Sequence, residues 1–111
     1  MKKVLVVMGS DSDLKVMEKC VDRLKSFDIP TEVRICSAAY TTLPVIGVPM
    51  ATSVMGGMDS LLSIVQMPKG IPVATVAIDG ADNAAILAAQ MIALSDDALA
   101  QKLAQFKADM A

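Results

Sequence analysis

A run of small polar residues directly follows the first apolar segment of the chain. Residues 3–8 (KVLVVM) lead into Gly9, Ser10, Asp11, Ser12 and Asp13, and a helical pattern begins after them. The first turn of a helix offers free N–H groups that bind anions, and the two serine hydroxyls could donate to phosphate oxygens. The two carboxylates would repel phosphate, but one of them could accept hydrogen bonds from sugar hydroxyls. The other interpretation is structural: a serine caps the helix and Asp13 is an acid of its first turn.

Other segments carry weaker signals. A glycine cluster at residues 55–60 could form a lid or a backbone binding surface, or a plain loop that enters a helix. Residues 79–83 (DGADN) predict a strand-to-helix turn with a cap. The sequence holds no histidine, which excludes a Ser-His-Asp triad and a zinc–histidine site. Cys20 and Cys36 lack a metal-binding spacing, so we expect two reduced thiols in the core.

The elements that must position these residues begin with a strand–helix–strand unit. The β-branched run at residues 3–8 predicts a strand that is buried on both faces. Leu14, Met17, Val21 and Leu24 follow at helical spacing, and Pro30 disfavours helix at the preceding residue. Residues 31–36 then predict a second strand, so the fold class is α/β.

The rest of the chain alternates in the same way. We expect strands at residues 45–48 and 73–78, and a helix or a loop at residues 58–66. Alanines on almost every face of residues 81–94 predict a buried helix. A final helix, capped by Ser95 or Asp96, carries an apolar stripe that could serve internal packing or subunit docking; its members are Leu99, Leu103, Phe106 and Met110.

Length and composition set further limits. The chain has 111 residues, enough for one domain covering 1–111, and it is 54% hydrophobic and 20% charged, which excludes a disordered chain. A net charge of −2 without a dense basic run argues against nucleic-acid binding. The longest apolar stretch, residues 84–94, is too short to span a membrane, and the N-terminus does not resemble a secretion signal, so we expect a cytoplasmic protein. So small a domain cannot easily cover this much apolar surface, which favours a homo-oligomer.

Four segments together resemble the PurE family. They are VVMGSDSD at residues 6–13, RICSA at 34–38, TTLPVIGVPM at 41–50 and the long run at 53–94. The resemblance implies a flavodoxin-like three-layer α/β/α fold with a parallel sheet, assembled as an octamer. It also implies an N5-carboxyaminoimidazole ribonucleotide mutase of purine synthesis, which acts on a phosphoribosyl aminoimidazole without metal or cofactor.

The resemblance also implies roles for single residues. Ser10 and Asp13 would bind the phosphate and ribose of the substrate, and Gly9, Ser12 and Ser37 would line the same pocket. A second set would lie near an active site, either of the same chain or of a neighbour; it consists of Gln66, Met67 and Pro68.

One departure from the family pattern lies after Ala38. The family continues there with His-Arg-Thr, a helix, a strand with a glycine-rich loop and another helix, on the order of 40 residues in all. Only eight residues, 37–44, join two predicted parallel strands here, whereas a parallel crossover needs a dozen or more. Either the 111-residue sequence lacks an internal segment of a longer protein, which we favour, or the deletion is real and the sheet is rearranged.

The missing segment includes the family's proton-transferring histidine, so no catalytic residue is assigned. We interpret the chain as a mutase by resemblance and expect its 111 residues alone to bind ribonucleotide weakly or not at all, without turnover. Two alternatives remain. One is a non-catalytic ribonucleotide-binding or oligomerisation module, and the other is a carboxylase that uses carbon dioxide directly.

Overall fold

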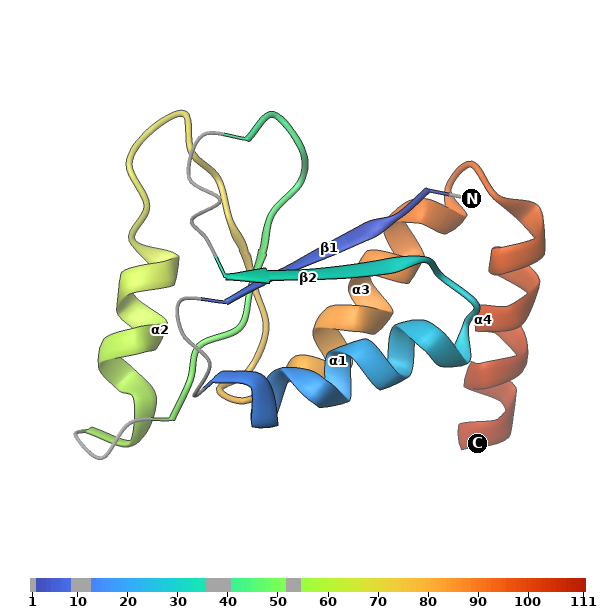
Figure 1. Ribbon diagram of the computed structural model, residues 1–111, viewed down its shortest axis with the longest axis horizontal. Coiled ribbons are helices and arrows are strands. Elements are labelled where there is room, and N and C mark those ends of the chain that lie inside the picture. The colour runs from blue at the N-terminus through green and yellow to red at the C-terminus, as the bar shows by residue number, and fades with distance from the viewer. Residues whose placement is uncertain (1, 9–12, 36–40, 52–54) are drawn as a thin grey trace.

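The computed structural model describes residues 2–8, 13–35, 41–51 and 55–111 (Figure 1). Helices and strands alternate along most of this length. Their order is β1 (Val4–Met8), α1 (Leu14–Ser26), β2 (Thr31–Ile35), β3 (Ile46–Gly47), η2 (Met55–Gly57), α2 (Met58–Val65), β4 (Ala74–Thr75), α3 (Ala81–Ala93) and α4 (Asp97–Met110). The predicted α/β class and the order of its elements are therefore confirmed, although β3 and β4 are shorter than the sequence suggests.

The strands form two separate parallel pairs. In the first pair Val4 lies opposite Thr31 and Met8 opposite Ile35, and in the second Ile46 lies opposite Ala74. No strand ladder joins the two pairs within the described residues. The parallel arrangement is as expected, but the sheet is divided between β1 and β3.

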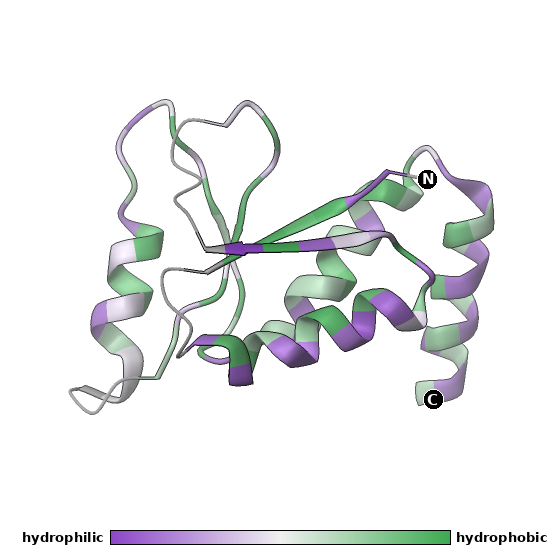
Figure 2. Ribbon diagram, in the orientation of Figure 1, coloured by the Kyte–Doolittle hydropathy of each residue, from purple (hydrophilic) through white to green (hydrophobic). Residues whose placement is uncertain are grey.

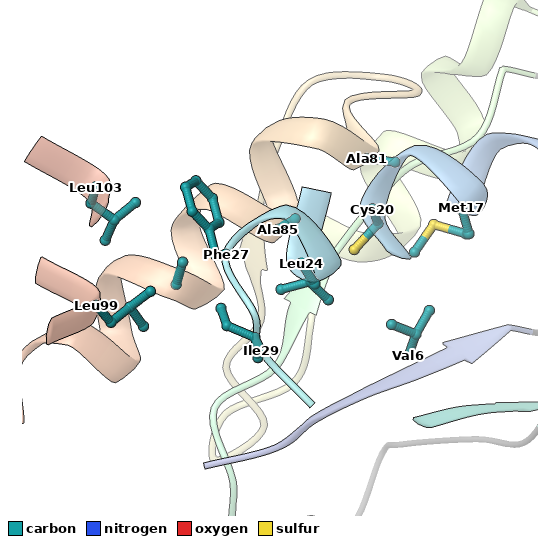
Figure 3. Packing of buried hydrophobic residues seen from close by; sticks show 11 residues of the cluster. Val6, Met17, Cys20, Leu24, Phe27, Ile29, Ala81, Ala85, Leu99 and Leu103 are labelled. Carbon is teal, nitrogen blue, oxygen red and sulfur yellow. The ribbon is translucent and has the colours of Figure 1, made fainter. Parts of the chain in front are cut away.

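Helices α1 and α3 pack against each other because one helix supplies large side chains and the other supplies alanines. Met17, Cys20 and Leu24 form the buried stripe of α1. They meet a face of α3 on which Ala81 and Ala85 are completely buried, and these small residues let the two backbones approach closely (Figure 3). The expectation that α3 is buried on every face is wrong, because Asn83 and Gln90 point to solvent.

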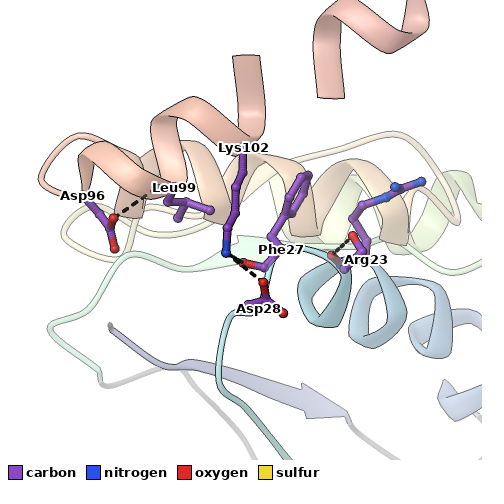
Figure 4. A network of polar contacts seen from close by, with 7 residues as sticks. Arg23, Phe27, Asp28, Asp96, Leu99 and Lys102 are labelled. Atoms are coloured by element: carbon purple, nitrogen blue, oxygen red, sulfur yellow. Dashed lines mark hydrogen bonds and ion pairs between the residues drawn. The ribbon is translucent and has the colours of Figure 1, made fainter. Parts of the chain in front are cut away.

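Helix α4 closes the other end of this core. The Asp96 carboxylate accepts a hydrogen bond from the Leu99 N–H at 3.0 Å, which identifies Asp96 rather than Ser95 as the cap (Figure 4). Leu99 and Leu103 are buried, and Phe106 meets Phe27 edge to face at 5.5 Å between ring centres. Most of the predicted stripe thus serves internal packing rather than subunit docking. Its last member, Met110, is exposed because the helix end extends beyond the core.

One face of the β1–β2 pair carries no described helix. Val6 points to α1 and is buried, whereas Leu5 points the other way and is 44% exposed. In Figure 1, α1 lies along one side of β1 and β2. Strand β1, which the sequence predicts to be buried on both faces, is therefore covered by a described helix on only one face.

The unit formed by β3, α2 and β4 contributes little to the core. The buried core cluster takes its members from β1, α1, the turn after α1, α3 and α4. Helix α2 has no buried residue, although it is largely apolar (Figure 2). We infer that this unit is held to the rest by fewer buried contacts than α1, α3 and α4 hold one another.

An ion pair joins α1 to α3 at the edge of the core. Arg23 Nε lies 2.6 Å from Asp82 Oδ1, and Arg23 Nη2 lies 3.1 Å from Asp82 Oδ2. The guanidinium also lies over the ring of Phe106, at 4.7 Å from its centre. The hydrogen bonds from Arg23 lower the pKa of Asp82 below its usual value of 3.8.

The pH dependence of stability should report this pair. Because the pKa of Asp82 is lower in the folded chain, its stabilisation is present above about pH 4 and is lost as the pH falls through the folded value. Both side chains are partly exposed, so Asp82→Asn should cost less than about 1 kcal/mol at pH 7 and almost nothing at pH 2. Urea unfolding at both pH values measures the difference, with Asp22→Asn on the exposed side of α1 as the control. An equal cost at both pH values would contradict the assignment.

Candidate functional site

The predicted binding residues follow the carboxyl ends of parallel strands, where α/β folds place their ligands. Strand β1 ends at Met8 and leads to Asp13, the residue before α1. Strand β4 leads to Asp79 and Gly80 before α3, and Figure 1 places this turn and the start of α1 at the same end of the molecule.

Asp13 is the one predicted substrate-binding residue that the structure describes. It is the N-cap residue of α1, it is half-buried, and its side chain makes no capping hydrogen bond. Asp13 directly precedes Leu14 and has helical backbone angles (φ −80°, ψ −14°), so its position fits both interpretations, as an acid at the start of the helix and as a substrate-binding residue. The other four residues lie outside the described ranges; they are Gly9, Ser10, Ser12 and Ser37.

Asp79 joins the chain segments that follow the carboxyl ends of β3 and β4, a contact that the sequence does not reveal. Its N–H donates to the Pro49 carbonyl at 2.7 Å, and its carboxylate accepts from the Ala51 N–H at 2.9 Å. The residue that caps α3 is Gly80, so the predicted strand-to-helix turn with a cap is confirmed, although this cap makes no side-chain hydrogen bond. Asp79 instead ties the segment after β4 to the segment after β3.

The glycine cluster before α2 packs against these two segments. Gly57 has a φ of 100°, and a Cβ there would lie 2.9 Å from Ile78 Cγ2 and 3.1 Å from the Met50 carbonyl oxygen. Only glycine fits both this conformation and this space. This packing agrees with the interpretation of the glycine cluster as a loop that enters a helix. The loop brings the start of α2 to the carboxyl ends of β3 and β4.

Gln66, Met67 and Pro68 lie at the opposite end of α2. Gln66 directly follows Val65, the last residue of α2, and its N–H donates to the Leu62 carbonyl. The chain then turns toward the start of β4. Figure 1 shows this turn far from the start of α1. Within one chain the structure therefore does not bring these residues to Asp13. That these residues lie near an active site, of the same chain or of a neighbour, stays a prediction.

Few groups in the described chain could move a proton near neutral pH. Burial raises the pKa of the Cys20 thiol to about 11, so this cysteine is a core residue, as expected, and not a nucleophile. Cys36 lies outside the described ranges. In the part of the chain that the structure describes, no three histidine, cysteine, aspartate or glutamate side chains lie close enough together to hold a metal ion. In the same residues, no helix has the length and hydropathy needed to cross a membrane.

Comparison with known proteins gives consistent matches. The family model for AIR carboxylase matches residues 3–40 and 38–111. The N5-carboxyaminoimidazole ribonucleotide mutase of Pyrococcus abyssi is 38% identical over 147 residues, which cover 99% of this chain and 84% of the relative. The mutase of Methanocaldococcus jannaschii is 40% identical, with 96% and 89% covered. A chloroplastic phosphoribosylaminoimidazole carboxylase of Vigna aconitifolia is 38% identical over 93% of this chain and 25% of its own length.

Solved structures share the fold. The crystal structure of a single-residue variant of Treponema denticola PurE2 superposes with a TM-score of 0.86 at 24% identity, covering 98% of this chain and 91% of that one. Treponema denticola PurE gives a TM-score of 0.73 at 23% identity, covering 95% and 89%. The flavodoxin-like α/β fold expected from the sequence is therefore confirmed.

The comparisons also locate the missing segment. The alignment to the Pyrococcus abyssi relative spans 147 residues, 36 more than the 111 of this chain. The family model matches in two stretches that meet at residues 38–40. The relative therefore has additional residues, and the break in the family model places them between β2 and β3.

Proposed function

The chain belongs to the AIR carboxylase family, and from this membership we propose that it serves the N5-carboxyaminoimidazole ribonucleotide mutase reaction of purine synthesis. In this reaction a carboxylate moves from N5 to C4 of the aminoimidazole ribonucleotide. The observation that carries the proposal is an identity of 38–40% to proteins of that name, over 95–99% of the chain.

The proposed substrate site is the turn between β1 and α1. The first N–H groups of α1 and the serine hydroxyls of residues 10 and 12 suit a phosphate, because both donate hydrogen bonds to it. The Asp13 carboxylate suits the ribose hydroxyls, because it accepts hydrogen bonds and makes no capping bond to α1. Gly9 and Ser37 complete the proposed pocket.

Substitution of Asp13 tests this site. Asp13→Ala should weaken the binding of aminoimidazole ribonucleotide by about 5- to 150-fold, which corresponds to about 1–3 kcal/mol for a lost charged partner of hydroxyl groups. We expect weak binding by the 111-residue chain, so an NMR titration that reaches millimolar nucleotide is the suitable measurement. Asp22→Ala, on the exposed side of α1, is the matched control. Equal affinity of the two variants would remove Asp13 from the site.

A carboxylase that fixes carbon dioxide directly is a second candidate in the same family. The observation that favours it is the Vigna aconitifolia carboxylase, which is as similar to this chain as the Pyrococcus abyssi mutase, at 38% identity. The two substrates separate the candidates. A mutase consumes N5-carboxyaminoimidazole ribonucleotide, and a carboxylase consumes aminoimidazole ribonucleotide with carbon dioxide.

A ribonucleotide-binding module without catalysis is the third candidate. The absence of histidine from all 111 residues favours it, since the family's proton-transferring group is then missing. The intact mass of the natural protein decides between this candidate and an incomplete sequence. A mass near 11.6 kDa supports a real deletion, and a mass larger by about 40 residues supports a longer enzyme.

We also propose that copies of the chain associate, as an octamer by family resemblance, through helix α2. The apolar stripe of α4, for which subunit docking was one of two interpretations, is used mostly inside the chain. Helix α2 instead exposes Met58, Leu62 and Val65 at spacings of four and three, which places them on one side of the helix. An association through this face is compatible with Gln66, Met67 and Pro68 reaching the site of a neighbour.

Light scattering at micromolar concentration tests the association. The unaltered chain should be oligomeric, and Leu62→Glu should dissociate it because a charge would be buried in an apolar interface. Ser63→Glu, on the same helix and also exposed, should leave the mass unchanged. A monomeric unaltered chain would contradict the proposal.

A further inference from the structure

Asp79 has a backbone conformation that only glycine adopts without strain. Its φ is 58°, in the left-handed region, and within the described residues Asp28 is the only other non-glycine residue there. Such residues persist where the surrounding structure determines them, and they cluster at functional sites. Asp28 follows α1 and pairs with Lys102 of α4, whereas Asp79 precedes α3 at the carboxyl ends of β3 and β4. Of the two aspartates, Asp79 is therefore the one beside the candidate site.

Asp79 makes a hydrogen bond to each end of the tripeptide formed by residues 49–51. Its N–H donates to the Pro49 carbonyl at 2.7 Å, and its carboxylate accepts from the Ala51 N–H at 2.9 Å. Pro49 is completely buried, and Met50 packs against the core cluster, so these two residues are also held by packing. Ala51 is exposed. Its position therefore depends on the Asp79 carboxylate more than the positions of Pro49 and Met50 do.

The turn that contains Asp79 also packs against the first half of α1. The Ala81 N–H donates to the Asp79 carbonyl at 2.9 Å, and Ala81 is completely buried beside Met17 and Cys20 of α1 (Figure 3). Asp79 thus lies between the start of α1 and the segment that follows β3. These two segments adjoin the carboxyl ends of β1 and β3, the edge at which parallel α/β folds bind their ligands.

We propose that Asp79 is a positioning residue of the ribonucleotide site, which holds the segment after β3 in place through Ala51. This inference rests on the proposed function, because the site is the one assigned there to the substrate. Asp79 does not touch the nucleotide in this role. It fixes one wall of the pocket before the ligand binds, so its loss should lower the affinity, because binding would then have to order this segment.

Three substitutions separate the side-chain bond from the backbone conformation. Asp79→Gly retains the left-handed backbone and removes the acceptor, whereas Asp79→Asn retains an acceptor oxygen and tolerates the same backbone. Asp28→Gly is the matched control, because it makes the same change at a φ of 59°, at the other end of α1. Urea unfolding should give the two glycine variants similar midpoints, since each loses one exposed contact of its carboxylate.

Amide hydrogen exchange tests the bond without any ligand. The Ala51 N–H should exchange roughly tenfold faster in Asp79→Gly than in the unaltered chain, because it loses its acceptor. In Asp79→Asn and Asp28→Gly it should exchange at about the unaltered rate. An unchanged rate in Asp79→Gly would overturn the inference, because the carboxylate would then not hold Ala51.

An NMR titration with aminoimidazole ribonucleotide, extended to millimolar concentration, tests the positioning role. Asp79→Gly should bind about tenfold more weakly than the unaltered chain, and Asp79→Asn and Asp28→Gly should bind within about twofold of it. Rescue by asparagine is the decisive readout, because a residue that acts through Ala51 needs an acceptor oxygen and not a negative charge. Equal weakening by the two glycine variants would show only a general loss of stability and would overturn the inference.

Two further results would contradict the role of Asp79. Equal affinity of Asp79→Gly and the unaltered chain would show that the site does not depend on this contact. An equal loss of affinity in Asp79→Asn and Asp79→Gly would show that the charge itself contacts the nucleotide. Failure of the proposed function gives a different result: the unaltered chain would bind no nucleotide while its Ala51 N–H remained protected, which would leave the hydrogen bond confirmed and Asp79 without a role in binding.

Discussion

The 111-residue chain alone should not convert N5-carboxyaminoimidazole ribonucleotide to its C4-carboxylated isomer, and insertion of a family helix–strand–helix segment after Ala38 should restore turnover. The reaction requires a group that transfers a proton near neutral pH, and the sequence contains no histidine. An ordinary carboxylate has a pKa of about 4 and is a weak proton donor at pH 7. The buried Cys20 thiol is no substitute, because its pKa is raised to about 11 and it lies in the core.

The inserted segment offers a matched control. One chimeric chain carries the segment of the Methanocaldococcus jannaschii relative with the histidine that family resemblance predicts after Ala38, and a second carries asparagine in its place. Loss of a general acid typically costs a factor of about 10²–10⁴, so the second chain should be slower by that factor. Absorbance follows the conversion. Turnover by the purified 111-residue chain, with its mass verified, would mean that a carboxylate or water transfers the proton.

The helical part of the fold could be predicted because its pattern is local. The spacing of Met17, Val21 and Leu24 predicts α1, and the helix begins at Leu14 and ends at Ser26 as that pattern suggests. Its end involves more than the effect of Pro30: Asp28 adopts a left-handed conformation, with its N–H bonded to the Lys25 carbonyl. A turn of this kind depends on one residue's conformation, which periodicity does not reveal.

The division of the sheet could be predicted only in part. The short connection after Ala38 shows that a regular crossover is impossible, but it does not show which strands remain paired. In the structure β3 keeps only two paired residues, because its partner on one side is β4 and no described strand lies on the other. Strand length therefore depends on neighbours from elsewhere in the sequence.

The candidate site shows the same contrast. The position of Asp13 before α1 follows from local sequence, since a glycine–serine–aspartate run between a strand and a helix indicates a turn. The role of Asp79 does not, because its carboxylate bonds to the N–H of Ala51, 28 residues earlier in the chain. Likewise, only the course of α2 shows that Gln66 lies at the other edge of the strands from Asp13.

Leu24→Ala should lower the free energy of unfolding by about 2–5 kcal/mol, the typical cost of a buried leucine truncated to alanine. Leu24 is completely buried, and its carbonyl accepts hydrogen bonds from the N–H groups of Phe27 and Ile29, so the cavity would lie where α1 turns into β2. Neighbouring core residues could not collapse easily into it, because they belong to three different elements. The core of this chain comes mainly from α1, α3 and α4, so no second cluster would compensate.

Urea unfolding followed by circular dichroism measures this cost, with Leu94→Ala as a control of identical chemistry. Leu94 is 91% exposed, so its truncation should change the free energy of unfolding by less than about 0.5 kcal/mol. Domains of this size are typically stable by only about 5–15 kcal/mol, so Leu24→Ala should leave a substantial fraction of molecules unfolded at low urea concentration if the chain lies at the lower end. Equal effects of the two truncations would show that α1 does not pack on α3 and β1 as described, and would remove the support that holds Asp13 at the start of the helix.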